Sequence, residues 1–443
     1  MRLFKSLYIN LFFFYALLGI VALFILSFFF NELFVLAQLM LLILMLVTLI
    51  DVFILFKLPN GLKAERKLEE KLSNGDQNEV RLQLHNFYPF TVHIKVVDEI
   101  PMQFQIRDFE INRVVQSGGL DEVAYYLRPV ERGVYSFGAL NCYASSILGF
   151  VARRYVFEKD AVVPVYPSFI QLRKYGLIAF NNQFMHFGLR KIRKIGHTSE
   201  FEQIKEYVRG DDIRTINWKA TAKRNELMVN QYQDEKAQEI YLAIDKGRLM
   251  KMPFEGMTLL DYAINATLVL ANVIINKSDK AGMFTFSHKV ENIIAADRRR
   301  NQMQLIMENL YAIKTDFKES DYSRLYVDIK RNLKQRSLVI LFTNFDTIES
   351  MNRHLIYLKG IAKSHLLVVV FFRNTELDDI ISKESSNLFE VFEKVTAEKY
   401  EFEKRLIVQE LRKHGIYSVL TEPENLTMET INKYLEIKAR GLV

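Results

Sequence analysis

The stretch that decides the fold covers residues 337–372 and reads SLVILFTNFDTIESMNRHLIYLKGIAKSHLLVVVFF. Its two ends, Ser337–Thr343 and Leu366–Phe372, are continuous apolar runs. Strands of a parallel sheet need this composition because both of their faces are buried. Between them, Ile348–Lys363 is long enough for a crossover helix. The stretch therefore predicts a strand–helix–strand unit with parallel strands.

The same alternation continues on both sides of this unit. Further apolar strands are expected at Ile240–Ile244, Gly282–Phe286 and Tyr417–Leu420. The helices expected between the strands are Leu259–Ile275, Met303–Lys314, Tyr322–Leu333 and Leu388–Lys413. Alternating strands and helices predict an α/β doubly wound domain, which together with the segment before it occupies residues 199–443.

Two apolar runs open the chain, the first from Ile9 to Phe30 and the second, after a short polar turn, to Phe56. Each exceeds the roughly 20 residues that a helix needs to cross a bilayer, so residues 1–57 are predicted to form a transmembrane hairpin. A cleavable signal peptide is the alternative, which the second run disfavours. Lysine and arginine flank both outer ends, and the positive-inside rule then predicts a two-pass protein of the cytoplasmic (inner) membrane with its soluble domains in the cytoplasm. Asp51, late in the second run, is interpreted as a carboxylate near the interface or against the partner helix.

Short alternating segments follow the apolar runs. Val80–Leu84 and Thr91–Val97 alternate in hydrophobicity, and Gly118-Gly119 is a typical turn. This pattern predicts a small all-β sandwich over residues 63–165. Residues 166–198 are rich in lysine and arginine interleaved with phenylalanine, and they are expected to form a solvated linker. Contact with an anionic membrane surface, or with nucleic acid, are the alternatives for this basic linker.

The composition excludes several classes of protein. Half of the 443 residues are hydrophobic and 25% are charged, which excludes wholesale disorder. A single cysteine, Cys142, excludes a disulfide framework and a multi-cysteine zinc site. The net charge of +7 fits acidic lipid, nucleic acid or an acidic protein surface without choosing among them. The sequence contains no phosphate-binding loop or dinucleotide fingerprint, and no nucleophile–base pair is evident in it.

The densest polar motif lies at residues 200–235, EFEQIKEYVRGDDIRTINWKATAKRNELMVNQYQDE. Gly210 supplies a turn, and Asp211 or its neighbour is expected to cap a helix. In that helix Arg214 and Trp218 stand four residues apart, where a guanidinium can lie over the indole. From the residues alone, this motif predicts a structural turn–helix unit.

The motif closely resembles the signature of the domain-of-unknown-function 58 (DUF58) family, a group of bacterial and archaeal membrane-associated proteins. The matching residues are Glu200, Phe201, Tyr207, Gly210, Asp211, Arg214, Ile216, Trp218, Lys219, Ala222, Leu227 and Glu235. The segments Arg132–Leu140 and Leu420–Leu442 also resemble the family, whereas Lys205 and Lys223 stand where it usually has arginine. The resemblance covers nearly the whole chain. It implies a von Willebrand factor A-like domain and a partnership with a MoxR-type AAA+ ATPase in complex assembly or envelope maintenance.

Domains of the A type commonly hold Mg²⁺ with Asp-x-Ser-x-Ser after the first strand, a threonine from another loop and a later aspartate. Here Asp245 is present, but Gly247 and Leu249 replace both hydroxyl residues, and Asn344 stands where the later acid is expected. The candidates for the position of the threonine are Ser320 and Ser323. Because Mg²⁺ needs oxygen ligands, this degraded pattern disfavours a metal centre and predicts no resident cofactor.

The sequence favours a membrane-anchored, non-enzymatic adaptor or scaffold whose A-type domain docks protein partners. The predicted partner-binding residues are Asp245, Arg248, Asn344 and Asp346, and Asp211, Arg214 and Trp218 are expected to brace that surface. Basic charge after Asp245 can receive a carboxylate of the partner without a metal. The alternative is a divalent-metal-dependent phosphate hydrolase at the membrane, and nucleic-acid binding is disfavoured.

Overall fold

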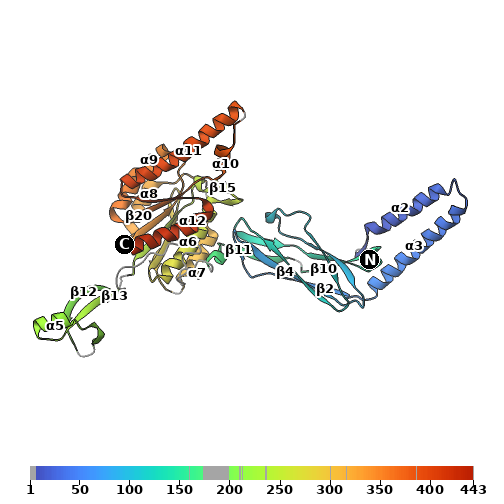
Figure 1. The fold of residues 1–443 in the computed structure, drawn as a ribbon, viewed down its shortest axis with the longest axis horizontal. Helices are drawn as coiled ribbons and strands as arrows, with labels where there is room; N and C mark the ends of the chain where they lie inside the picture. Colours follow the sequence, from blue (N-terminus) through green and yellow to red (C-terminus); the bar gives the residue numbers. More distant parts are fainter. Residues whose placement is uncertain are drawn as a thin grey trace. The chain divides into compact units, whose positions relative to one another are not determined.

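The computed structural model describes residues 6–158, 160–172, 199–208, 211, 213–234, 237–299, 301–315, 317–385 and 387–442. It divides the chain into two compact units, Met1–Tyr166 and Pro167–Val443 (Figure 1). The first unit contains apolar helices and β-sheets, and the second contains a β-hairpin and an α/β region. The finer predicted domain boundaries stay predictions. Most of the predicted basic linker lies outside the described residues.

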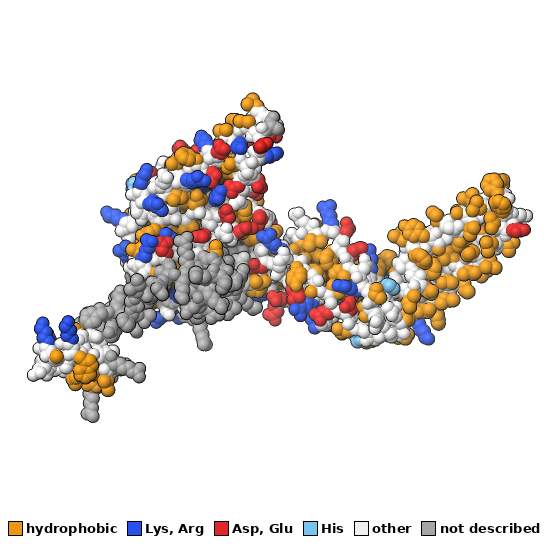
Figure 2. All heavy atoms as spheres, in the orientation of Figure 1, with side chains coloured by type: hydrophobic (Ala, Val, Ile, Leu, Met, Phe, Trp, Pro, Cys, Tyr) orange, Lys and Arg blue, Asp and Glu red, His pale blue; other side chains and the backbone are white. Residues whose placement is uncertain are grey.

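Two apolar helices, α2 (Leu11–Leu26) and α3 (Glu32–Phe56), lie in the first unit and expose mainly hydrophobic side chains (Figure 2). With 25 residues, α3 is long enough to cross a bilayer. The 16 residues of α2 span about 24 Å, so this helix is shorter than the apolar run from Ile9 to Phe30 that was predicted to form it. The first residue of that run, Ile9, instead belongs to strand β1 (Leu7–Ile9). The two helices are candidate membrane spans, and the side of the membrane on which the rest of the chain lies stays a prediction.

The C-terminal part of α3 is hydrogen-bonded to the β-sheets. The buried Asp51 carboxylate accepts hydrogen bonds from the Ser146 hydroxyl and from two backbone N–H groups at the start of strand β10 (Val151–Phe157). Arg153 of the same strand donates to three carbonyl oxygens at the end of α3 and just beyond it. These bonds satisfy carbonyl groups that the end of a helix leaves without partners. Asp51 therefore joins the helix to a sheet, which neither sequence-based interpretation of this residue anticipated.

The strands of the first unit pack around one hydrophobic core. The described strands pair in the orders β2-β4-β7, β1-β10-β9-β5-β6 and β3-β11-β8. Besides β1 and β10, their bounds are β2 Leu62–Lys67, β3 Leu72–Ser73, β4 Asn78–Asn86, β5 Val92–Asp98, β6 Glu110–Val115, β7 Leu120–Leu127, β8 Gly133–Phe137, β9 Leu140–Ser145 and β11 Ala161–Tyr166. Alternate residues of β4 and β5 are buried, as the period-two pattern predicts.

A buried ion pair links two of these sheets. Arg66 of β2 donates to the carboxylate of Asp98 of β5, and neither side chain is exposed. Tyr125 of β7 donates its hydroxyl to the same carboxylate, and burial raises the pKa of this tyrosine. The guanidinium of Arg66 also lies 5.1 Å from the ring centroid of Phe137. These contacts satisfy a charge that would be costly to bury alone.

The signature motif forms a β-hairpin with a short helix, which differs from the prediction. Strands β12 (Ser199–Glu206) and β13 (Met228–Asp234) pair antiparallel, and α5 (Trp218–Arg224) lies between them in sequence. The side chain of Asn217 caps α5 by accepting the N–H of Ala220, so the helix begins later than predicted. Asp211 instead accepts hydrogen bonds from Lys205 and the backbone N–H of Val208. Asn217 caps the helix, and the aspartates earlier in the sequence do not, because a cap must be adjacent to the first turn.

The described strands of the α/β region form a sheet of order β18-β17-β14-β19-β20-β21. Their bounds are β14 Glu239–Asp245, β17 Lys280–Phe286, β18 Val290–Asp297, β19 Leu338–Phe342, β20 Leu366–Phe372 and β21 Tyr417–Thr421. All neighbours are parallel except β18, which runs antiparallel to β17 at one edge. In chain order the sheet reads 3-2-1-4-5-6, the arrangement of a doubly wound fold. Sequence analysis missed β18, whose residues are mostly half-buried or exposed.

Helices pack on both faces of this sheet (Figure 1). One hydrophobic core contains residues of α6 (Leu259–Asn276), α7 (Gln302–Ala312) and α12 (Leu426–Ala439). The other contains residues of α8 (Tyr322–Asn332), α9 (Ile348–Ser364) and α11 (Leu388–Lys413). α6 is apolar enough to pass for a membrane span, but it is mostly buried and belongs to the core.

Candidate functional site

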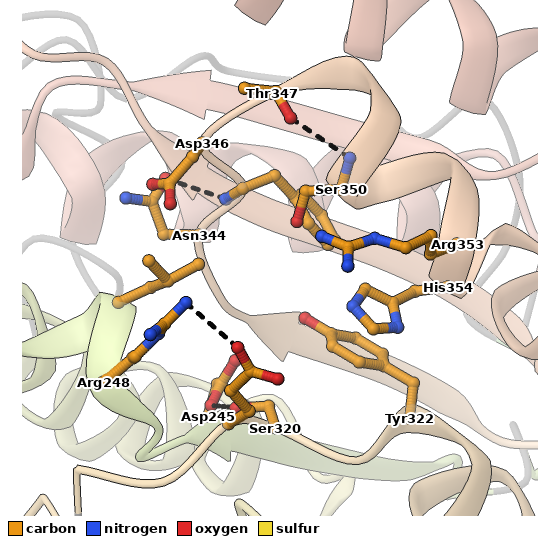
Figure 3. A pocket seen from close by; sticks show the side chains of 13 residues that line it. Asp245, Arg248, Ser320, Tyr322, Asn344, Asp346, Thr347, Ser350, Arg353 and His354 are labelled. Atoms are coloured by element: carbon orange, nitrogen blue, oxygen red, sulfur yellow. Dashed lines mark hydrogen bonds and ion pairs between the residues drawn. The ribbon is translucent and has the colours of Figure 1, made fainter.

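The candidate site lies at the carboxyl ends of β14 and β19, the two central strands where the strand order reverses. Ligands of doubly wound sheets bind at this point because the loops diverge there. The structure has a cavity of about 220 Å³ at this edge (Figure 3). Its lining includes Asp245, Arg248, Glu319, Ser320, Tyr322, Asn344, Asp346, Thr347, Ser350, Arg353 and His354. The four residues predicted to bind a partner thus line one cavity.

Asp245 ends β14 with its side chain buried. One carboxylate oxygen accepts hydrogen bonds from the backbone N–H of Gly247, 2.8 Å away, and from the Ser320 hydroxyl. The other accepts the Thr343 hydroxyl at 2.7 Å. Burial raises the pKa of Asp245, although these bonds oppose the shift. The carboxyl group is therefore held by neutral donors of the protein itself.

The basic residues that follow Asp245 do not pair with it in the structure. Lys246 pairs with Glu291 of β18, and this ion pair lowers the pKa of Glu291 to about 2. Arg248 pairs with Glu319 across the loop at 3.0 Å, and both side chains are well exposed. These partners arise because the chain turns outward after Gly247. Arg248 therefore lies at the mouth of the cavity rather than over the carboxylate (Figure 3).

The residues present do not fit a resident Mg²⁺. Ser320, of the two serines considered, is the one that reaches Asp245, whereas Ser323 bonds to Asp321. A Cβ at Gly247 would lie 2.2 Å from the Ser320 oxygen, so the hydroxyl lost from the loop has no room to return. Asp245 is already engaged by three donors, and Mg²⁺ requires near-octahedral oxygen ligands. No cluster of three or more His, Cys, Asp or Glu at metal spacing occurs among the described residues.

A buried lysine contacts Asn344, the residue that stands where the later acid of the metal-binding pattern is expected. Lys404 of α11 is 1% exposed, and its ammonium donates to the side-chain oxygen of Asn344 at 2.8 Å and to the carbonyl of Phe345. The backbone N–H of Phe345 donates to the same Asn344 oxygen. Burial lowers the pKa of Lys404 to about 8. The amide oxygen that would face a metal therefore faces a cation of the protein.

Lys404→Met is expected to remove a pH dependence of stability. In the folded state the lysine loses its proton near pH 8 rather than at its ordinary pKa of 10.5. Between these values the unfolded chain binds more protons, so the wild type gains stability as the pH rises, by roughly 2–3 kcal/mol in total. Urea unfolding of both full-length proteins in detergent, from pH 7.5 to 10.5, measures this difference. Parallel stability curves for the two proteins would contradict it.

The rim of the cavity carries two arginines from different elements. Arg248 follows β14, and Arg353 lies in the second turn of α9, on the far side of the cavity (Figure 3). Thr347 caps α9 by accepting the N–H of Ser350, so the positive end of this helix also faces the cavity. His354 stacks on Tyr322 with centroids 4.3 Å apart, and burial lowers its pKa. The rim thus combines fixed positive charge with a neutral imidazole.

Sequence analysis did not anticipate several residues of this site. They are Ser350, Thr343, Tyr322, Arg353, His354 and Lys404. Thr343 was the easiest to find, because it is the last residue of the predicted strand Ser337–Thr343, at the edge where ligands bind. Lys404 gave no signal, since a lysine within a long amphipathic helix is ordinarily solvated.

The signature residues that the structure describes do not line this cavity. Tyr207, Asp211, Trp218 and Lys219 belong to the hairpin of β12 and β13 and to α5, and Trp218 is 70% exposed. Gly210 and the side chains of Glu200 and Arg214 lie outside the described residues, as does the predicted stacking of Arg214 on Trp218. The prediction that these residues brace the docking surface therefore stays a prediction.

Comparison with known proteins identifies the segment that carries the site. Residues 203–384 match the family model described as "Protein of unknown function DUF58". The chain carries a DUF58 segment. This match confirms the resemblance over residues 203–384, which begin within β12 and include β13, β14, β19 and α9. The DUF58 segment ends before α11 begins.

The chain also has a curated relative and similar solved structures. "Uncharacterized protein YeaD" of Bacillus subtilis (strain 168) is 26% identical over 126 residues, which are 28% of this chain and 31% of that protein, so the match spans about a third of its relative. The SpRpn10 VWA domain is similar at 10% identity and a TM-score of 0.29, covering 44% of this chain and 93% of that one. The conserved hypothetical protein BatB from Bacteroides thetaiotaomicron is similar at 14% identity and a TM-score of 0.30, covering 46% and 100%.

Proposed function

We propose that this protein is a membrane-anchored, non-enzymatic adaptor whose A-type domain docks protein partners at the cavity at the carboxyl ends of β14 and β19. In this proposal α2 and α3 form the anchor in the inner membrane, the β-sheets of the first unit form a sandwich, and both soluble parts lie in the cytoplasm. The partner presents an acidic side chain or a chain terminus to the rim.

The observation that carries the proposal is the state of the Asp245 carboxylate. Both of its oxygens are engaged by donors of the protein, and Asn344 is engaged by Lys404. Neither group is therefore available to activate a nucleophile or to hold a cation. The groups that face a ligand at the rim are the two arginines, the carboxylates of Asp346 and of Glu319, which pairs with Arg248, and the N-terminal turn of α9. Arginine beside a helix N-terminus is well suited to a carboxylate, which it can bind through two parallel hydrogen bonds.

The resemblance to the DUF58 family supports the choice of partner. It implies a MoxR-type AAA+ ATPase, and we propose that the ATPase or its client docks at this rim during complex assembly or envelope maintenance. A protein without its own catalytic groups would contribute position and specificity, while the ATPase supplies the free energy.

The alternative, a divalent-metal-dependent phosphate hydrolase at the membrane, requires a cation that Asp245 helps to hold. It predicts divalent-metal binding that Asp245→Ala abolishes, together with phosphoesterase turnover by the purified protein. The hydrogen bonds that already occupy Asp245 disfavour this alternative. Metal binding measured by isothermal calorimetry on the full-length protein in detergent distinguishes the two functions.

Reversal of the rim charge is expected to release the partner. We expect the double variant Arg248→Glu/Arg353→Glu, cross-linked in native membranes and purified, to recover about tenfold less of the AAA+ ATPase than the wild type, because like charges then face the partner's acid. Arg331→Glu is the matched control, since this exposed arginine lies at the opposite end of α8 from the cavity. Mass spectrometry quantifies the recovered ATPase. Equal recovery from the double variant and the control would exclude this docking site.

A further inference from the structure

α11 carries an apolar stripe on its outward face. Leu388 is 86% exposed, Phe392 70%, Val395 57% and Phe402 59%. These residues are spaced by four, three and seven positions, so they lie on one side of the helix. Phe389 and Val391, beside the stripe, are exposed as well. Large exposed apolar side chains that gather on one surface mark interaction sites.

The opposite side of the same helix is the side that packs on the domain. Its buried residues, Ala397, Lys404, Ile407 and Leu411, all lie in its second and third thirds. The first nine residues, Leu388–Thr396, include none that is buried, and this end of α11 extends away from the sheet together with α10 (Glu376–Ser382) (Figure 1). At 26 residues the helix is about 39 Å long, which is more than its contact with the core requires. The stripe is therefore not explained by packing within the described domain.

The segment that carries the stripe is acidic. Between Glu376 and Glu403 the sequence contains nine carboxylates and three lysines, although the whole chain has a net charge of +7. Glu398 and Glu403 lie on either side of the stripe, and Lys399, which lies within it, pairs with Glu403. The projection formed by α10 and α11 is thus apolar along one line and carries a net negative charge.

We propose that the projection of α10 and α11 docks a partner protein that offers an apolar groove with a basic rim. An amphipathic helix binds such a groove through side chains at positions i, i+4 and i+7, which here are Leu388, Phe392 and Val395. The net negative charge of the projection favours a protein with a basic rim over a membrane or a second copy of the chain. An anionic bilayer attracts helices with lysine and arginine beside the apolar face and repels this one. A second copy of the chain would place the same carboxylates against each other across a symmetric interface.

This surface is separate from the rim of Arg248 and Arg353, and the proposal goes beyond the adaptor function. Its apolar stripe on α11 lies outside the DUF58 segment, which ends at residue 384, whereas α10 lies within that segment. Two different surfaces of opposite charge, one basic and one acidic, would let the domain hold two proteins or two parts of one.

A photo-cross-linking amino acid at position 392 of the full-length protein in native membranes tests the proposal, with the same probe at Ile356, a 70% exposed apolar residue of α9, as the control. We expect an adduct at position 392 with another protein, whose cross-linked surface is apolar and ringed by lysine and arginine. In the Glu398→Lys/Glu403→Lys background the adduct falls at least about fivefold, because the rims then repel. It persists in the Arg248→Glu/Arg353→Glu background, which separates this surface from the cavity.

Each other outcome overturns the proposal. A phospholipid adduct at position 392 would make the projection a membrane contact, and an adduct to a second copy of this chain would make it a dimer interface. A protein adduct that is no stronger than that at position 356, that lands on an acidic surface, or that is unchanged by the two lysines would exclude a basic groove as the occupant.

Discussion

Asp98→Ala is expected to lower the free energy of unfolding of the first unit by about 4 kcal/mol. The substitution removes the carboxylate that holds Arg66 and Tyr125, and both remain buried. One terminal nitrogen of Arg66 already has no hydrogen-bond partner, so the guanidinium has little else to compensate its charge. Hydrogen exchange of the amides of β4 and β5 in the full-length protein reports the loss locally.

The double variant Arg66→Met/Asp98→Leu is the control for this prediction. It removes both charges and fills the space with apolar side chains, so we expect it to recover most of the stability that Asp98→Ala loses. If the double variant were as unstable as the single one, the cost would come from packing rather than from an unpaired charge. If Asp98→Ala cost less than about 1 kcal/mol, the link between the two sheets would not be a main source of stability.

Asp245→Ala is expected to cost about 3 kcal/mol in the α/β region. It leaves the hydroxyls of Ser320 and Thr343 and the N–H of Gly247 without their common acceptor, and each buried unpaired donor costs about 1–3 kcal/mol. The loops that carry the cavity would separate, since this carboxyl group joins three of them. Urea unfolding of the full-length protein in detergent measures the loss.

Asp245→Asn provides the matched comparison. Its oxygen can still accept two of the three hydrogen bonds, and no charge is buried, so we expect a loss of less than about 1 kcal/mol. Burial raises the pKa of Asp245, so protonation of this side chain favours the folded state. The wild type loses this contribution to its stability as the pH rises through the raised pKa. The asparagine variant should lack that pH dependence. Equal losses for Ala and Asn would mean that the charge itself, through a cation, stabilises the loop.

The strands of the α/β sheet were predictable because a buried parallel strand needs apolar residues on both faces. Runs such as Leu366–Phe372 leave no other interpretation, and β20 has these bounds. The position of the cavity followed from the same logic, since Asp245 and Asn344 directly follow the predicted strands Ile240–Ile244 and Ser337–Thr343. The local sequence pattern was sufficient for these features, because burial of both strand faces requires apolar residues and ligands bind just after the strand ends.

Other features depended on contacts between residues distant in sequence. Lys404 reaches Asn344 from a helix 60 residues later, and Asp51 meets a strand about 100 residues away. β1, which ends at the first residue of the apolar run, was not predicted, because it is defined by its pairing with β10, more than 140 residues away. The predicted start of α5 was wrong because three residues that can cap a helix, Asp211, its neighbour and Asn217, stand close together in sequence. In the folded hairpin, Asn217 is the residue that caps α5.

The central claim is that the rim of the Asp245 cavity docks a MoxR-type AAA+ ATPase or its client. The most direct test is a titration of the purified full-length protein, in lipid nanodiscs, with the purified MoxR-type ATPase of the same organism. The account predicts saturable binding that weakens at least about tenfold in Arg248→Glu/Arg353→Glu and is unchanged in Arg331→Glu. Binding of equal strength to all three proteins, or no binding to the wild type with or without client, would contradict it.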